Sequence, residues 1–196
     1  MKKFTSTDIR EFLTPVKKPT WMNESCGSTP DSTLPEIDYS TLDAKDLFGK
    51  LVVALRGMQI WFHGAHVLVK GTGFSGDHVN LYGRVYKEID DQLDASMEKA
   101  IGITGDESVV CPQMIIKTLA KVSDLYSSPS DASAIEIART GLKITHDFLT
   151  ALEVIYHVLK AQEMLTLGTE DFIASLANTH EGYAYLLGQR VKNNLD

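Results

Sequence analysis

The chain of 196 residues is 43% hydrophobic and 23% charged, which is typical of one globular domain with a sizeable core. No apolar run approaches the roughly 18 residues of a membrane-spanning helix, and the first residues lack the apolar core of a secretory signal, so we expect no membrane association and a cytoplasmic protein. A net charge of −7 opposes non-specific attraction to nucleic acid, and two cysteines are too few for a disulfide framework or a thiolate metal cage.

Residues 1–38 differ in composition from the rest of the chain. Four prolines interrupt every helical pattern there, namely Pro15, Pro19, Pro30 and Pro35. Lysine and arginine are confined to the first eighteen residues, and six acidic side chains are spread over the segment. We expect an extended arm that is solvated or clasps a partner, with a nucleic-acid-binding arm as the alternative. Residues 39–196 then form the globular part.

A first long helix is predicted from Ser40 or Thr41, whose hydroxyl groups suit a helix N-cap, to a glycine stop at Gly71. Its apolar residues recur at intervals of three, four and seven, which defines one buried stripe. The stripe consists of Leu47, Leu51, Leu55, Met58, Phe62 and Val69.

The segment GTGFSG, from Gly71 to Gly76, formally matches the dinucleotide-binding pattern G-x-G-x-x-G. That pattern binds a pyrophosphate only where a strand enters the loop within a βαβ unit. Here a helix precedes the loop, so we expect a tight corner between two helices and no nucleotide site.

A second long helix is predicted after the corner, ending at Gly102, with the stripe Tyr82, Val85, Tyr86, Ile89, Leu93, Met97 and Ile101. Possible metal ligands lie on both sides of the corner: His63, His66, Asp77, His78, Asp90, Asp91, Asp94 and Glu98. Imidazole and carboxylate groups together suit iron, manganese or zinc. A metal site is therefore the leading hypothesis, and the alternative is an ordinary solvated acidic helix face.

Three further helices are predicted in the second half of the chain. A short one begins at Pro112, a long one runs from about Ile135 to Gly168, and the last opens at Thr169. We expect their histidines, His146, His157 and His180, to be hydrogen-bonded core residues and not ligands. Four long helices with one long crossover that carries a short helix predict an all-α, ferritin-like four-helix bundle.

The corner resembles a family signature. AHVLVKGTGFSGDH is similar to the motif of Dps, the DNA-binding proteins from starved cells, with its elements at His66, Lys70, Gly71, Phe74 and His78. Downstream, LDASMEKAIG resembles the segment in which that family places an Asp and a Glu four residues apart, here Asp94 and Glu98. The final helix is also similar, and the likeness covers roughly residues 40–192.

This resemblance implies a hollow, dodecameric homo-oligomer, which oxidises ferrous iron with hydrogen peroxide or oxygen and stores ferric mineral. It also implies a ferroxidase site shared by two subunits, with His66 and His78 from one and Asp94 and Glu98 from the other. Iron is the implied metal, with zinc or manganese as possible occupants of the same site. DNA binding would be weak and would use the lysines of the arm. The alternative function is a ferritin-like shell or scaffold whose ferroxidase site is impaired or lost.

The chain departs from the family pattern at three positions. Tyr82 stands where the family has a further carboxylate, and Val67 replaces a common tryptophan, which leaves Trp61 as a possible substitute. The interval from His78 to Asp94 is one residue longer than in the family. One extra residue rotates two groups on a regular helix by about 100°. We expect a π-bulge or a shifted helix start to absorb it, with Gly83 as a plausible place.

Overall fold

The computed structural model describes residues 39–192, so the arm and the last four residues lie outside the described part. The described part is all-α. Its elements are η2 (Tyr39–Thr41), α2 (Ala44–Leu68), η3 (Gly76–Tyr82), α3 (Gly83–Thr104), η4 (Glu107–Val110), α4 (Pro112–Val122), α5 (Ala134–Ala161) and α6 (Leu167–Lys192). No strand occurs between residues 39 and 192. None of the helices described is long and apolar enough to cross a membrane.

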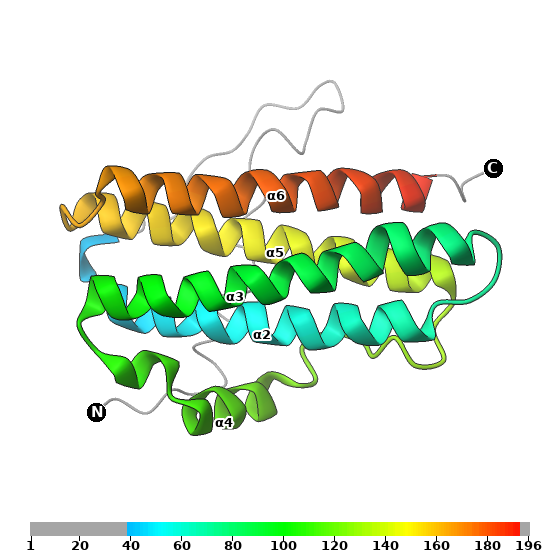
Figure 1. Ribbon diagram of the computed structural model, residues 1–196, viewed down its shortest axis with the longest axis horizontal. Helices are drawn as coiled ribbons and strands as arrows, with labels where there is room; N and C mark the ends of the chain where they lie inside the picture. The colour runs from blue at the N-terminus through cyan, green and yellow to red at the C-terminus, as the bar shows by residue number, and fades with distance from the viewer. Residues whose placement is uncertain (1–38, 193–196) are drawn as a thin grey trace, which may run out of the picture.

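The four longest helices, α2, α3, α5 and α6, lie side by side as a bundle (Figure 1). Helix α2 packs along α3, α5 packs along α6, and α2 also contacts α5. Two tight connections join α2 to α3 and α5 to α6, whereas the path from α3 to α5 runs through η4 and α4 (Figure 1). The predicted short helix at Pro112 is confirmed as α4, with its proline in the first turn.

The predicted apolar stripe of α2 is confirmed, since all six of its residues are buried. The second predicted stripe is buried in part. Tyr82, Val85, Ile89 and Leu93 are buried, whereas Tyr86, Met97 and Ile101 are half-buried. Polar groups also enter the bundle, namely Ser96, Thr118, Thr145, Asp147, Thr169 and His180. Cys111 is a free thiol at the start of α4.

Several predicted helix ends are wrong. Helix α2 begins after Asp43, whose carboxylate accepts from the backbone amide of Lys45 at 3.0 Å, and Tyr39–Thr41 forms a separate 3₁₀ turn. It ends at Leu68, before Gly71. Helix α3 passes through Gly102 and ends at Thr104, because Gly105 adopts the left-handed conformation with φ of 63°.

Helix α5 ends at Ala161, seven residues before the predicted stop at Gly168. The terminating residue is Glu163, with φ of 57°, and the amide of Met164 reaches back to the carbonyl of Leu159 at 2.9 Å. This is a helix stop in which a non-glycine residue occupies the left-handed position. Helix α6 then opens at Leu167, two residues before the predicted Thr169.

Candidate metal centre

The corner between α2 and α3 is built on glycine. Gly71 and Gly73 both have φ of 89°, a conformation that side chains with a Cβ rarely adopt. Two backbone bonds close the turn, from Phe74 to the carbonyl of Gly71 at 3.1 Å and from Asp77 to that of Gly73 at 3.0 Å. The sequence GTGFSG therefore forms a corner between two helices, as predicted, and a helix, α2, precedes it.

A π-helix, Gly76–Tyr82, follows the corner and leads into α3. The amide of Gly83 donates to the carbonyl of His78, five residues earlier, instead of the α-helical four. A π turn accommodates one residue more than an α turn, and this one lies within the interval from His78 to Asp94, where the resemblance implies an additional residue. The expected π-bulge is present, and it ends at Gly83.

The central finding at this site is the pairing of His66, near the end of α2, with His78, in the π-helix. Their rings are stacked with centroids 3.8 Å apart and planes 14° from parallel. Nδ1 of His66 is 2.6 Å from the carbonyl oxygen of His78, and Nδ1 of His78 is 2.6 Å from the carbonyl oxygen of His66. The same two residues thus make two reciprocal hydrogen bonds.

These two bonds fix the tautomer of each imidazole. A carbonyl oxygen has no proton to donate, so Nδ1 must carry the hydrogen in both rings. In the neutral imidazole the proton-free lone pair is then on Nε2. Ligand histidines in metalloproteins commonly hold their second ring N–H in this way, on a backbone carbonyl. The pair therefore has the chemistry of two prepared nitrogen donors.

Gly83 makes the pairing possible. A Cβ atom at this position would lie 2.6 Å from the carbonyl oxygen of His78 and 3.0 Å from Nδ1 of His66. Only glycine leaves room there for the π turn and for the imidazole that donates to the same carbonyl. The sequence suggested Gly83 as a place for a bulge but did not indicate this close approach to His66.

Aromatic rings extend the pair on both sides. Phe74 stacks on His78 with centroids 4.9 Å apart, and Tyr86 lies 5.1 Å from His66 and 4.5 Å from His63. His63 is exposed, and Tyr86 is half-buried. The sequence places Tyr86 in the apolar stripe and so does not predict its contact with both histidines. Its position three residues after Gly83 is the only feature of the sequence that indicates this contact.

Tyr82, which stands at the family's carboxylate position, faces the core. Its side chain is fully buried and its ring lies 6.4 Å from that of Phe62. The phenol oxygen has no hydrogen-bond partner among the described residues. Burial, assisted by the charge of Asp77, raises the pKa of Tyr82, so the phenol stays protonated. Tyr86, and not Tyr82, is the tyrosine whose ring lies next to His66.

Asp94 and Glu98 are exposed on α3. Sixteen residues of continuous helix separate His78 from Asp94, which corresponds to more than about 20 Å along the axis. One chain therefore does not bring these carboxylates to the histidine pair. No three His, Cys, Asp or Glu side chains between residues 39 and 192 are placed to hold a metal ion. Any site that joins all four residues needs a second chain.

A clamp of two charged residues holds the corner from the other side. Nε of Arg190, in the last turns of α6, donates to both carboxylate oxygens of Asp77 at 3.0 and 2.9 Å. Its terminal nitrogen also donates to the carbonyl of Thr72 at 3.1 Å. Figure 1 shows the corner at the same end of the bundle as the last turns of α6. Asp77 is buried, with only 6% of its surface exposed.

A second group of polar side chains joins α3 to α6. Tyr183 donates to Glu88, whose other oxygen accepts from Nε of Arg84 at 2.7 Å. Burial alone would raise the pKa of Glu88, but these two hydrogen bonds lower it. One turn away, Nε2 of His180 is 2.8 Å from the side-chain oxygen of Gln92.

His180 is fully buried, and its Nδ1 has no partner among the described residues. Burial lowers its pKa to about 3, so the ring is neutral near pH 7. The expectation that His180 is a hydrogen-bonded core histidine is confirmed for Nε2, which pairs with Gln92, but not for Nδ1. His146 and His157 line a hollow between α5 and α6 and are only half-buried, so the expectation that they are core residues is wrong. His157 lies 4.0 Å from Glu153.

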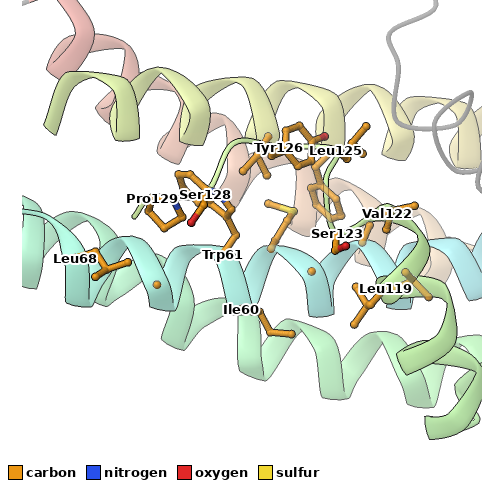
Figure 2. A pocket seen from close by; sticks show the side chains of 17 residues that line it. Ile60, Trp61, Leu68, Leu119, Val122, Ser123, Leu125, Tyr126, Ser128 and Pro129 are labelled. Carbon is orange, nitrogen blue, oxygen red and sulfur yellow. The ribbon is translucent and has the colours of Figure 1, made fainter. Parts of the chain in front are cut away.

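An apolar hollow of about 450 Å³ lies on another face. It is lined by residues of α2, α4, α5 and the segment 123–129 (Figure 2). Trp61 lines it and donates from its indole nitrogen to the carbonyl of Ser127 at 3.0 Å. Its other neighbours include Leu119 and Pro129, so Trp61 packs against this connection and does not contact the histidine pair.

Comparisons of the chain with known protein families, with curated proteins and with solved structures found no significant match.

Proposed function

We propose that the protein is a ferritin-like ferroxidase and iron-storage protein of the Dps type, which assembles from identical subunits. The observation that carries the proposal is the reciprocal pairing of His66 and His78, which presents two imidazoles with proton-free Nε2 atoms. A purely structural contact between two helices does not require two histidines in the same tautomer.

The stacking suggests how ferrous ions would bind as the substrate. An imidazole binds a metal ion close to its own ring plane, and the planes of two rings with centroids 3.8 Å apart and only 14° from parallel meet far from both rings. Each histidine would therefore serve its own ion. Ions in two-metal sites lie about 3.5–4 Å apart, close to this stacking distance.

Two nitrogen donors alone do not complete two iron sites. Asp94 and Glu98, four residues apart on α3 and both exposed, are available to a neighbouring copy. We propose that these carboxylates of one subunit face His66 and His78 of another. Carboxylates suit both oxidation states of iron, so the site would hold Fe²⁺ and release Fe³⁺ to a mineral. Zinc or manganese would compete for the same donors.

The reaction itself transfers two electrons. Each of two ferrous ions gives one electron to hydrogen peroxide, which takes up two protons and becomes two water molecules. Both electrons reach one peroxide molecule, so no hydroxyl radical is released. The role of the protein is to hold the two ions close together at the moment of transfer.

Exposed apolar side chains near the corner favour assembly. Ile60, Val67, Leu68, Phe74 and Val79 are between 40% and 62% exposed, and all flank the histidine pair in the chain. Apolar surface of this kind is typical of an interface. A shell of identical subunits, with twelve as the family number, would cover it.

The decisive experiment is an anaerobic ferrous titration followed by hydrogen peroxide, with the particle mass measured on the same sample. The proposal expects a large closed particle that binds about two ferrous ions per subunit. It expects these ions to be oxidised as soon as peroxide is mixed in. A monodisperse monomer at micromolar concentration would overturn both the assembly and the shared site.

A shell or scaffold without efficient ferroxidase activity is the second candidate. It is favoured by Tyr82, which is buried in the core where the family has a carboxylate, so that one expected ligand is missing. The same titration separates the two functions. A large particle that binds no ferrous iron would support the scaffold.

A further inference from the structure

We propose that Arg190 is a positioning residue for the histidine pair: by clamping Asp77 and the carbonyl of Thr72, it holds the corner in the shape that brings His78 onto His66. The geometric part of this inference stands on the fold, and its meaning for metal binding rests on the proposed function.

The corner has few other restraints. Residues 71–76 are all exposed, and two of them are glycines with positive φ. Glycine has more conformations available than any other residue, so a loop that depends on it does not keep one shape by itself. The two turn bonds lie within the corner and do not attach it to the bundle.

Arg190 supplies that attachment. Its guanidinium group contacts the corner at two points, the Asp77 carboxylate and the Thr72 carbonyl, five residues apart in the sequence. The side chains of Asp77 and Arg190 are only 8% and 19% exposed. A buried charge that loses its partner is strongly destabilising, so the corner would rearrange if Arg190 were removed. A Cβ atom at position 73 would lie 3.4 Å from the guanidinium group of Arg190, so Gly73 is also close to the clamp.

Asp77 and His78 are consecutive residues in the π-helix, and they face different helices. Asp77 contacts Arg190 on α6, whereas His78 contacts His66 on α2. A shift of Asp77 moves the backbone of His78 with it. Both Nδ1 bonds of the pair depend on that backbone, because one uses the carbonyl of His78 and the other its ring. The clamp therefore affects the tautomers of His66 and His78 and not only the stability of the fold.

The test uses the full-length protein in its natural assembly, with Arg190→Gln and Arg190→Lys as variants. The first readout is the tautomer of His66 and His78, from nitrogen-15 NMR of the metal-free protein at one pH. The second is the affinity for Co²⁺, measured by titration. Arg190→Gln should convert His78 to a mixture of tautomers and weaken Co²⁺ binding on the order of 10-fold or more. Arg190→Lys, which keeps the charge but lacks the second donor group, should recover part of both.

Arg84→Gln is the matched control. It removes an exposed arginine of α3 that is paired with Glu88, one turn later on the same helix, so it should change neither the tautomers nor the Co²⁺ affinity. A folded Arg190→Gln protein with unchanged tautomers and unchanged affinity would overturn the inference.

If Arg190→Gln fails to fold, the double variant Asp77→Asn with Arg190→Gln removes both charges and leaves no unpaired buried ion. A folded double variant that keeps both tautomers and the parental affinity would also overturn the inference, and one that loses them supports it. These readouts need no iron oxidation. Failure of the ferroxidase proposal would appear as an inactive parental protein, whereas failure here would appear only in the comparison of variants.

Discussion

Gly83 donates its amide to the carbonyl of His78, and that oxygen also accepts from the ring of His66, so one backbone position carries both the π turn and the histidine pair. There is no space for a side chain at position 83, because a Cβ atom would lie 2.6 Å from the carbonyl oxygen of His78. The geometry of the pair therefore depends on a residue that has no side chain.

Gly83→Ala should destabilise the protein by about 1–3 kcal/mol and disrupt the pair, because the π turn must open to admit the methyl group. Urea unfolding measures the first effect and Co²⁺ titration the second. Gly102→Ala is the control in the same helix, where a Cβ meets nothing within 4 Å. It should stabilise the protein by roughly 0.5–1 kcal/mol. Equal effects at the two glycines would contradict the close approach described here.

Asp94→Ala combined with Glu98→Ala should slow peroxide-dependent iron oxidation on the order of 10–100-fold or more, because the variant lacks the proposed carboxylate ligands. Helical content and assembly should not change, since both side chains are exposed and the bundle is held by its apolar stripes. Stopped-flow absorbance after peroxide mixing gives the rate. His146→Ala is the control and should keep the parental rate. If the double variant oxidises iron normally, Asp90 and His63 are the next candidates, although Asp90 lies 3.9 Å from Arg56.

His180 should make the protein less stable in weak acid. Its pKa is about 3 in the fold and about 6.5 in the unfolded chain. Between these values the unfolded state binds a proton that the folded state does not, so stability is full above about pH 6.5 and falls as the pH decreases. The slope from this group approaches about 1.4 kcal/mol per pH unit below pH 6.

Denaturant unfolding between pH 7 and pH 5 tests this expectation, with His180→Gln as the variant. Glutamine retains a donor for Gln92 but cannot be protonated. The decrease in the free energy of unfolding with falling pH should therefore be smaller in the variant by the contribution of His180. A parallel pair of curves for the parent and His180→Gln would contradict the expectation, because it would show that His180 takes up a proton as readily in the fold as in the unfolded chain.

Two buried tyrosines give opposite predictions for the same substitution. Tyr183→Phe removes a hydrogen bond to the charged Glu88 and should cost about 1–2 kcal/mol. Tyr82→Phe removes a buried hydroxyl that has no protein partner among the described residues, and it should be neutral or stabilising. Thermal and urea unfolding of both variants make the comparison. A large loss from Tyr82→Phe would indicate a partner for that hydroxyl, such as a bound water.

DNA binding, if it is measurable, should be weak and should require the first eighteen residues, which carry the lysines of the arm. Those residues lie outside the described part of the chain. A mobility-shift assay of the full chain and of a variant without residues 1–18 tests this at two salt concentrations. Tight binding that survives both the deletion and moderate salt would contradict the electrostatic argument.

The sequence predicts the helices of this fold better than their ends. Burial of Leu51, Leu55 and Phe62 follows from periodicity alone, because any helix must turn one face to the core. The stop of α5 has no such signal, since Glu163 takes a conformation that glycine usually marks. At Gly102 the opposite error occurs, because an exposed glycine lies inside α3.

The candidate site shows the same division. The spacing of His66 and His78 predicts that the two residues meet, since both flank one short corner. Nothing local in the sequence predicts that Arg190 clamps this corner, because 113 residues separate it from Asp77. The contact of Tyr86 with His66 is equally hidden, because aromatic residues in an apolar stripe are usually core.

The distance in sequence between Asp77 and Arg190 also affects how the protein forms during synthesis. Helices α2 and α3 leave the ribosome while α6 is still untranslated, so for that time Asp77 has no Arg190 to pair with. Chains grow at about 5–20 residues per second, which makes this interval several seconds long. During it Arg190 is not yet available to contact Asp77 or Thr72. The clamp can therefore close only after α6 has been made.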